Sequence, residues 1–108
     1  MATITIDPNS TDQQIDVRVG DSIVVALPEN PTTGFRWTIR TDLLPVAELL
    51  SDTFDPVAGE MFGAPGVRRF TFDATQTGRA TLWLENCQEW EPNAAAADTF
   101  SITVAVLV

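Results

Sequence analysis

The sequence predicts an all-β protein, an antiparallel β-sandwich of seven to eight strands. Apolar residues recur at every second position in one short segment after another, which is the period of a strand with one buried face. These segments follow one another at fairly regular spacing and are separated by turn residues. That many short strands in 108 residues are typical of two packed sheets in a single domain over residues 1–108.

The alternation defines seven segments along the chain. Gly20 and Asp21 predict a turn after the second segment, and Pro28 predicts the end of the third. The apolar positions of the segments, in order, are Ile4 and Ile6; Ile15, Val17 and Val19; Ile23, Val25 and Leu27; Phe35, Trp37 and Ile39; Phe70 and Phe72; Ala80, Leu82 and Leu84; and Phe100, Ile102, Val104 and Val106.

Two tryptophans are assigned to opposite faces by their places in this alternation. Trp37 stands two residues after Phe35 in the apolar set, which predicts a position in the core. Trp83 lies between Leu82 and Leu84, which predicts that it points away from the face those leucines share.

Two stretches lack a clear strand period. Residues 43–50 are mostly apolar and fit either a short strand or one helical turn. Residues 94–97 are all alanine, which favours helix by propensity, but so short a run does not form a stable helix alone. We therefore expect residues 94–97 inside a loop.

Composition limits the classes of partner. The chain has 15 acidic and 6 basic residues, a formal net charge of −9. Nucleic acids and anionic membranes are bound through Lys and Arg, so neither is an expected partner. The apolar run of about 18 residues that a membrane helix needs is absent, and the first residues do not resemble a signal peptide. The location stays open between the cytoplasm and a secreted or periplasmic form whose leader was removed.

Reactive side chains are scarce. The absence of histidine removes Ser–His and Cys–His nucleophile pairs and the usual zinc ligand sets. Cys87 is the only cysteine, and its neighbours Glu85 and Glu89 disfavour a thiolate, so we expect a structural cysteine, with a disulfide between two chains left open. Glu85, Glu89 and Glu91 lack the spacing of a calcium loop. No enzymatic activity, metal or cofactor is expected.

Three connections are expected at one end of the sandwich if neighbouring strands run up and down in turn. They span residues 27–35, about 52–66 and 85–98. The second holds Met61 and Phe62 in a glycine-rich stretch, and the third holds Trp90 between two glutamates. Apolar side chains of this kind are costly to expose and are common at protein interfaces. The alternative is that Phe62 and Trp90 fold back over the open end of the core.

The first of these connections is stiff and chemically inert. Pro31 fixes its own φ and holds Asn30 extended. Thr32 and Thr33 are β-branched, and Gly34 permits a backbone angle or close approach that other residues resist. This combination predicts a loop that projects in a fixed shape, which suits a groove on another protein better than it suits catalysis.

Three stretches match the signatures of one known family. The first reads Asn30-Pro31-Thr32-Thr33-Gly34-Phe35, with no departure from the family signature. The second reads Gly63-Ala64-Pro65-Gly66, with Pro65 where many members have glycine. The third is usually Arg-Pro-Trp and here reads Gln88-Glu89-Trp90. From residue 15 to residue 106 the chain resembles the chagasin-like inhibitors of papain-family cysteine peptidases.

The resemblance implies an immunoglobulin-like β-sandwich, monomeric when free, whose three loops wedge into the cleft of a papain-like or cathepsin-L-like peptidase. It implies that Thr32 and Thr33 lie near the catalytic cysteine of the enzyme, and that inhibition is reversible and non-covalent. The implied peptidase-binding residues are Asn30, Pro31, Thr32, Thr33, Gly34, Phe35, Met61, Phe62, Gly63, Ala64, Pro65, Gly66, Gln88, Glu89 and Trp90.

The departure in the third signature bears on the choice of target. The missing arginine removes a fork of hydrogen-bond donors, and Glu89 adds a negative charge. We therefore expect a changed preference among cysteine peptidases, or weaker binding to some of them. Two other readings of the chain stay open: a non-inhibitory binding module that uses the same loops for a peptide or carbohydrate, and a structural domain whose loops only close the core.

Overall fold

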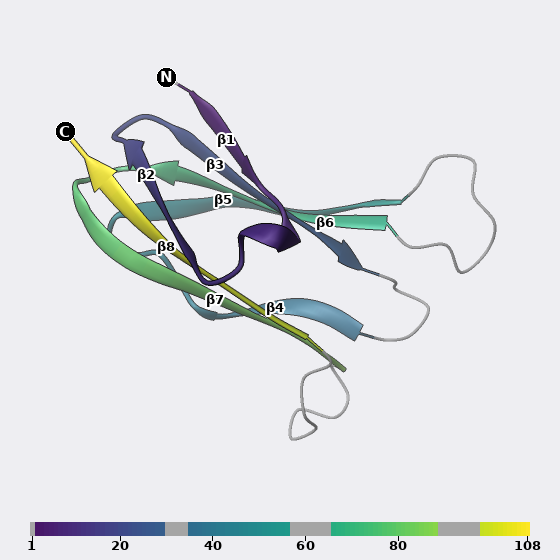
Figure 1. The fold of residues 1–108 in the computed structure, drawn as a ribbon. Helices are drawn as coiled ribbons and strands as arrows, with labels where there is room; N and C mark the ends of the chain where they lie inside the picture. The colour runs from purple at the N-terminus through teal and green to yellow at the C-terminus, as the bar shows by residue number, and fades with distance from the viewer. Residues whose placement is uncertain (1, 30–34, 57–65, 89–97) are drawn as a thin grey trace.

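The computed structural model describes residues 2–29, 35–56, 66–88 and 98–108, and these ranges contain eight strands and one short 3-10 turn (Figure 1). None of the elements in these ranges is a helix long and apolar enough to span a membrane. The elements are β1 (Thr3–Ile6), η1 (Pro8–Ser10), β2 (Gln13–Arg18), β3 (Ser22–Glu29), β4 (Phe35–Thr41), β5 (Ala47–Pro56), β6 (Gly66–Ala74), β7 (Gly78–Gln88) and β8 (Asp98–Leu107).

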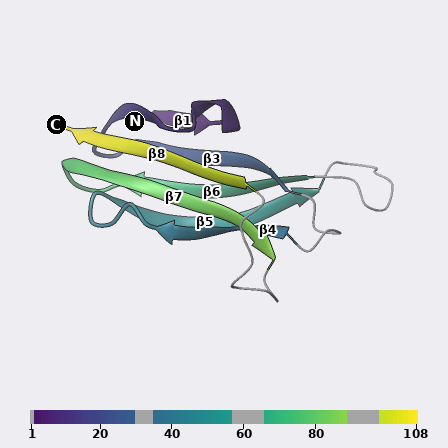
Figure 2. The same cartoon turned by 60° about the horizontal axis from the view of Figure 1, so that its bottom comes forward.

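The strands form two four-stranded sheets. One sheet has the order β1-β3-β6-β5 and the other has the order β2-β8-β7-β4. Toward the right of Figure 1 the two layers are separate, with β8, β7 and β4 below β3, β6 and β5, and in Figure 2, after a turn of 60°, one layer is seen over the other. The predicted all-β, immunoglobulin-like sandwich is confirmed.

The two N-terminal strands pair in parallel, which departs from the antiparallel prediction. β1 runs parallel to β3, with Thr3 opposite Ser22, and β2 runs parallel to β8, with Gln13 opposite Ile102. The other pairings, β3–β6, β5–β6, β4–β7 and β7–β8, are antiparallel. The chain crosses from one sheet to the other between β1 and β2 instead of turning back in a hairpin, so both strands can join in parallel.

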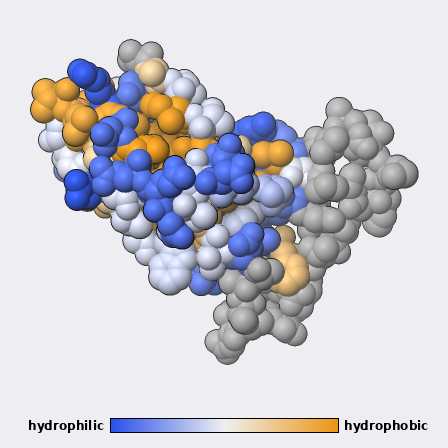
Figure 3. Space-filling view, viewed as in Figure 1, coloured by the Kyte–Doolittle hydropathy of each residue, from blue (hydrophilic) through white to orange (hydrophobic). Residues whose placement is uncertain are grey.

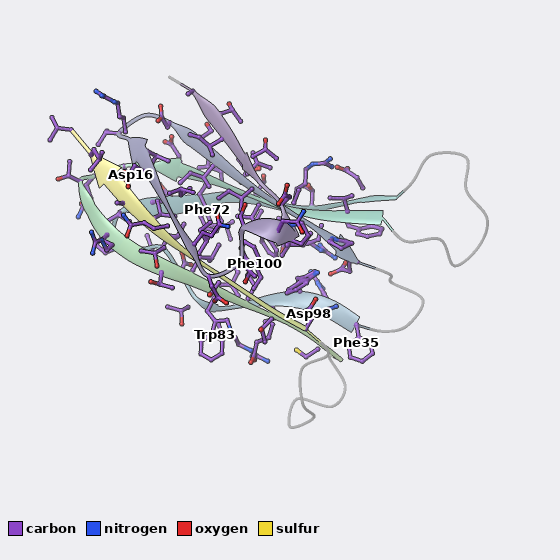
Figure 4. The ribbon with its side chains drawn as sticks, viewed as in Figure 1. Asp16, Phe35, Phe72, Trp83, Asp98 and Phe100 are labelled. Carbon is purple, nitrogen blue, oxygen red and sulfur yellow. The ribbon has the colours of Figure 1, made fainter. Side chains whose placement is uncertain are left out.

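The alternation of the sequence produces the core. Trp37 is 4% exposed and Trp83 is 45% exposed, so the predicted faces of both tryptophans are confirmed. Figure 4 shows Phe72 and Phe100 between the layers and Trp83 pointing outward. In the described ranges, the buried residues that form the core cluster are Ile6, Val17, Ile23, Val25, Leu27, Trp37, Leu43, Val46, Ala47, Phe70, Phe72, Ala74, Leu82, Leu84, Phe100, Ile102, Val104 and Val106.

Apolar side chains also reach the surface near the chain termini. Val19 donates its N–H to the carbonyl of Leu107, and both side chains are exposed together with that of Val108. In Figure 3 polar and apolar residues mix over the visible face, with apolar groups gathered toward the end that carries the C-terminus. This end lies opposite the strand ends that border residues 30–34, 57–65 and 89–97 (Figure 1).

Two predicted strand boundaries are wrong. Pro28 does not end its strand, because β3 continues to Glu29. β1 accompanies β3 only as far as Val25, so one side of β3 is open at Pro28, and an open edge tolerates a residue without an N–H. β7 extends to Gln88, several residues beyond the predicted start of the third connection at Glu85.

The ambiguous residues 43–50 contain both of the predicted alternatives. The N–H groups of Val46 and Ala47 donate to the carbonyl of Leu43 at 3.0 and 3.2 Å, which forms a single turn. β5 then begins at Ala47 and runs to Pro56, so the second predicted connection starts later than residue 52. The alanine run at 94–97 lies outside the described residues.

Candidate functional site

Six strand ends meet at one end of the sandwich. The ends of β3, β5 and β7 lie at the same end as the starts of β4, β6 and β8, and these six strand ends border residues 30–34, 57–65 and 89–97 (Figure 1). The residues paired at these ends are Glu29 with Gly66, Pro56 with Gly66, Phe35 with Gln88, and Asn86 with Asp98.

β3 ends in a buried carboxylate. Glu29 continues the core-facing alternation that includes Leu27, and it is 3% exposed. Its Oε1 accepts a hydrogen bond from the backbone N–H of Trp37 at 2.8 Å, while the indole Nε1 of Trp37 donates to the carbonyl of Pro28 at 2.9 Å. These two bonds join β3 to β4, and hence one sheet to the other, across residues 30–34.

Arg68 supplies the charge that the buried Glu29 requires. Its Nε and Nη2 donate to Oε2 of Glu29 at 3.1 and 2.7 Å, and its Nη1 donates to Oδ1 of Asp52 at 3.0 Å. The guanidinium carbon lies 5.5 Å from the centroid of the Phe54 ring, a cation–π contact. We call Glu29, Arg68, Asp52 and Phe54 the strand-end network.

The central ion pair of this network is shielded from water. The side chains of Arg68 and Glu29 are 11% and 2% exposed. Burial opposes the charge of Arg68, but the hydrogen bonds and negative charges of Glu29, and then those of Asp52, raise the pKa of Arg68 above its ordinary value. Arg68 therefore stays protonated at physiological pH. Removal of Arg68 would leave Glu29 buried without a charged partner, which typically costs roughly 3–5 kcal/mol, whereas removal of Glu29 would leave Arg68 bonded to Asp52.

Gly66 is required by packing against this network. A Cβ at Gly66 would lie 2.4 Å from the backbone oxygen of Asp55 and 2.5 Å from Cζ of Phe54. Phe54 also lies under the guanidinium of Arg68. Gly66, the last residue of the second predicted signature, is therefore required by packing within the sandwich.

A second polar cluster ties β4 to β7 in the other sheet. Nε of Arg40 donates to Oε1 of Glu85 at 2.8 Å, and its Nη2 donates to Sγ of Cys87 at 3.4 Å. The hydrogen bond that Arg40 donates to Glu85 is the largest cause that raises the pKa of Arg40. Cys87 is 6% exposed and lies within β7, so its predicted place in a loop is wrong, while its burial fits a structural residue.

The structure describes only part of the predicted binding set. Phe35 opens β4 and is half-buried, Gly66 opens β6, and Gln88 is the last residue of β7, so the third signature begins inside a strand. The other members lie outside the described residues: Asn30, Pro31, Thr32, Thr33, Gly34, Met61, Phe62, Gly63, Ala64, Pro65, Glu89 and Trp90.

Glu29 and Arg68 were not among the predicted site residues, although their positions in the sequence indicate burial. Glu29 lies two residues after Leu27, and Arg68 lies two residues before Phe70, so each falls on a core-facing position. Opposite charges at two such positions near strand ends indicate a buried pair. The register that brings them together could not be read from the alternation alone.

The charged side chains described at this end have a structural role. In the ranges that the structure describes, no group of three or more His, Cys, Asp and Glu side chains is placed to hold a metal ion. The charged side chains of the strand-end network bond to one another and to a backbone N–H. Such an arrangement holds strand ends in place and offers no activated nucleophile.

Comparison with known proteins agrees with this geometry. Residues 16–104 match the family described as Chagasin family peptidase inhibitor I42. Amoebiasin-1 of Entamoeba histolytica is 32% identical to the chain, over 96% of this chain and 98% of its own length.

Two solved structures have the same fold. The cysteine protease inhibitor EhICP2 of Entamoeba histolytica superposes with a TM-score of 0.87 at 23% identity, covering 99% of this chain and 97% of its own. PbICP-C, solved in complex with falcipain-2, superposes with a TM-score of 0.71 at 15% identity, covering 99% and 100%. With its signatures, its sandwich and these matches, the chain belongs to the chagasin family of peptidase inhibitors, a family of inhibitors and not of enzymes.

Proposed function

We propose that the chain is a reversible, non-covalent inhibitor of papain-family cysteine peptidases that fills the active-site cleft with residues 30–34, 57–65 and 89–97. The observation that carries the proposal is the convergence of the six bordering strand ends at one end of the sandwich. Family membership supports the class of target, and a structural neighbour was solved in complex with falcipain-2.

Within this proposal, Thr32 and Thr33 enter the cleft beside the catalytic cysteine. Each hydroxyl can donate and accept hydrogen bonds. Because neither has a base to activate it as a nucleophile, neither forms a covalent bond with the peptidase. Met61 and Phe62 on one side and Trp90 on the other supply apolar anchors. An interface of standard size buries about 800 Å² on each partner, which three segments of this length can provide.

Affinity in this mechanism depends on rigidity. Pro31 and the two threonines reduce the conformational entropy lost on binding, so more of the contact energy appears as affinity. Glu89 adds a negative charge beside Trp90, in the position where the family signature carries proline. We infer that this charge shifts the preference of the chain away from peptidases with acidic clefts.

The proposal is tested by titrating the chain against papain and a cathepsin-L-like peptidase, with hydrolysis of a fluorogenic peptide as the readout. We expect inhibition that is reversible on dilution, with one chain bound per enzyme. Thr33→Arg places a bulky charge in the cleft and Trp90→Ala removes an anchor, and each should raise the inhibition constant by roughly 30-fold or more, the equivalent of a hot spot.

Trp83→Ala is the matched control for Trp90→Ala. It removes the same side chain from the exposed outer face of β7 and should leave inhibition unchanged. If micromolar concentrations of the chain inhibit neither enzyme, the alternative of a non-inhibitory binding module is favoured. If both variants are folded and inhibit as strongly as the parent chain, the proposed occlusion of the cleft by these segments is excluded.

A further inference from the structure

The strand-end network connects the two sides of two separate segments. Glu29 directly precedes residues 30–34, and Trp37, which donates its N–H to Glu29, follows them. Arg68 follows residues 57–65, and Asp52 lies on the strand that precedes them. One set of hydrogen bonds therefore spans the strand ends that border both segments.

The network also spans the gap between the two sheets. Glu29 and Arg68 belong to one sheet, and Trp37 belongs to the other. Where the edge strands β5 and β4 face each other, Oδ2 of Asp52 lies 4.0 Å from Nη2 of Arg36. This ion pair is a second link between the sheets. Asp52 is thus shared between Arg68 in its own sheet and Arg36 in the opposite one.

Stability alone does not account for a charged pair at this place. Glu29 and Arg68 occupy core-facing positions, where apolar side chains of similar volume are often equally stabilising or more so. What an apolar pair cannot supply is direction. The fork of Arg68 fixes the position of the Glu29 carboxylate at the end of the β3–β6 ladder, and the second oxygen of Glu29 fixes the position of the Trp37 backbone in the opposite sheet.

We propose that Glu29, Arg68 and Asp52 are positioning residues that set the relative placement of segments 30–34 and 57–65, so that both enter one peptidase cleft without rearrangement. This inference rests on the proposed function and deepens it. Segment 89–97 is bordered by β7 and β8, and no described hydrogen bond joins either strand to the strand-end network. The ties of β7 run to β4 through Arg40 instead.

The test compares two substitutions of adjacent residues on β6. R68M removes the buried pair between β6 and β3, whereas R69M removes an ion pair between β6 and Asp55 on β5, where the Arg69 side chain is 42% exposed. Because R68M alone leaves Glu29 buried without its partner, E29Q/R68M is measured beside it. The E29Q side chain still offers an oxygen to the N–H of Trp37.

Inhibition constants, association rates and dissociation rates are measured against papain at a temperature where circular dichroism shows every variant folded. We expect E29Q/R68M to raise the inhibition constant about tenfold or more, chiefly through slower association, because a smaller fraction of molecules holds both segments in the competent arrangement. R69M should change it by less than about twofold. A folded E29Q/R68M that associates and inhibits like the parent chain overturns the positioning role.

A parent chain that does not inhibit refutes the proposed function, and the positioning role is then decided by backbone amide NMR. E29Q/R68M should shift the amide resonances of the non-proline residues within 30–34 and 57–65 and leave those within 89–97 in place. Shifts confined to the immediate neighbours of residues 29 and 68, or spread equally over all three segments, would overturn it.

Discussion

Substitution of Gly66 by alanine distinguishes packing from peptidase contact at the end of the second signature. The added Cβ would lie 2.4 Å from the Asp55 carbonyl oxygen, 1.0 Å inside the 3.4 Å at which ordinary contact begins, and 2.5 Å from Cζ of Phe54. The Phe54 ring can rotate away, but the backbone oxygen belongs to a paired strand and moves only with that strand.

The expected cost of Gly66→Ala follows from this geometry. Overpacking that forces a backbone shift typically costs about 1–3 kcal/mol, and two simultaneous contacts place this case near the upper end. For a domain of this size that corresponds to a fall in Tm of roughly 10 °C. Thermal unfolding followed by circular dichroism, together with urea unfolding, measures the effect.

Two outcomes separate the explanations of Gly66. Phe54→Leu/Gly66→Ala should recover part of the loss caused by alanine at this position, because it relieves one contact and leaves the Asp55 oxygen in place. A Gly66→Ala chain with the Tm of the parent and weakened inhibition would refute the packing argument and assign Gly66 to the peptidase surface.

Two further predictions concern the sandwich itself. The carboxylate of Asp21 accepts backbone N–H bonds from Arg18 at 2.9 Å and Ala2 at 3.0 Å, and these bonds, in that order, lower its pKa below the ordinary value of 3.8. A lowered pKa stabilises the folded state above pH 3.8, and that stability is lost as the pH falls through the folded pKa, so Asp21→Asn should lower Tm at pH 7 and converge with the parent chain in acid. A Tm difference independent of pH would contradict this. Trp37→Phe removes the indole bond to the Pro28 carbonyl and part of a buried ring, and should cost about 1–3 kcal/mol in urea unfolding. A variant as stable as the parent would show that this bond contributes nothing.

The sandwich was predictable because its core follows a period of two. Phe70 and Phe72, or Leu82 and Leu84, face inward in any register that buries one side of their strands. The parallel pairing of β1 and β2 was not predictable, because alternation is the same for a parallel and an antiparallel strand. The crossing between the sheets depends on the path of the chain from Ile6 through η1.

The candidate site was predictable in part. The signatures at Asn30 and at Gly66 adjoin strand ends that lie at one end of the sandwich, and these strands were predictable because they alternate regularly. The pairing of Glu29 with Arg68 required the register of β3 against β6 and a contact between residues 39 positions apart. The place of Gln88 inside β7 depended on how far that strand follows β4, which turn residues do not reveal.

Non-covalent occlusion of the peptidase cleft can be tested by a single binding experiment. The affinity of the chain is measured by calorimetry for a papain-like peptidase whose catalytic cysteine has been replaced by alanine, and again for the active enzyme after an irreversible small inhibitor has filled its cleft. We predict binding of one chain to the alanine enzyme and no binding to the filled one. Loss of binding to the alanine enzyme, or unchanged binding to the filled cleft, would contradict the account.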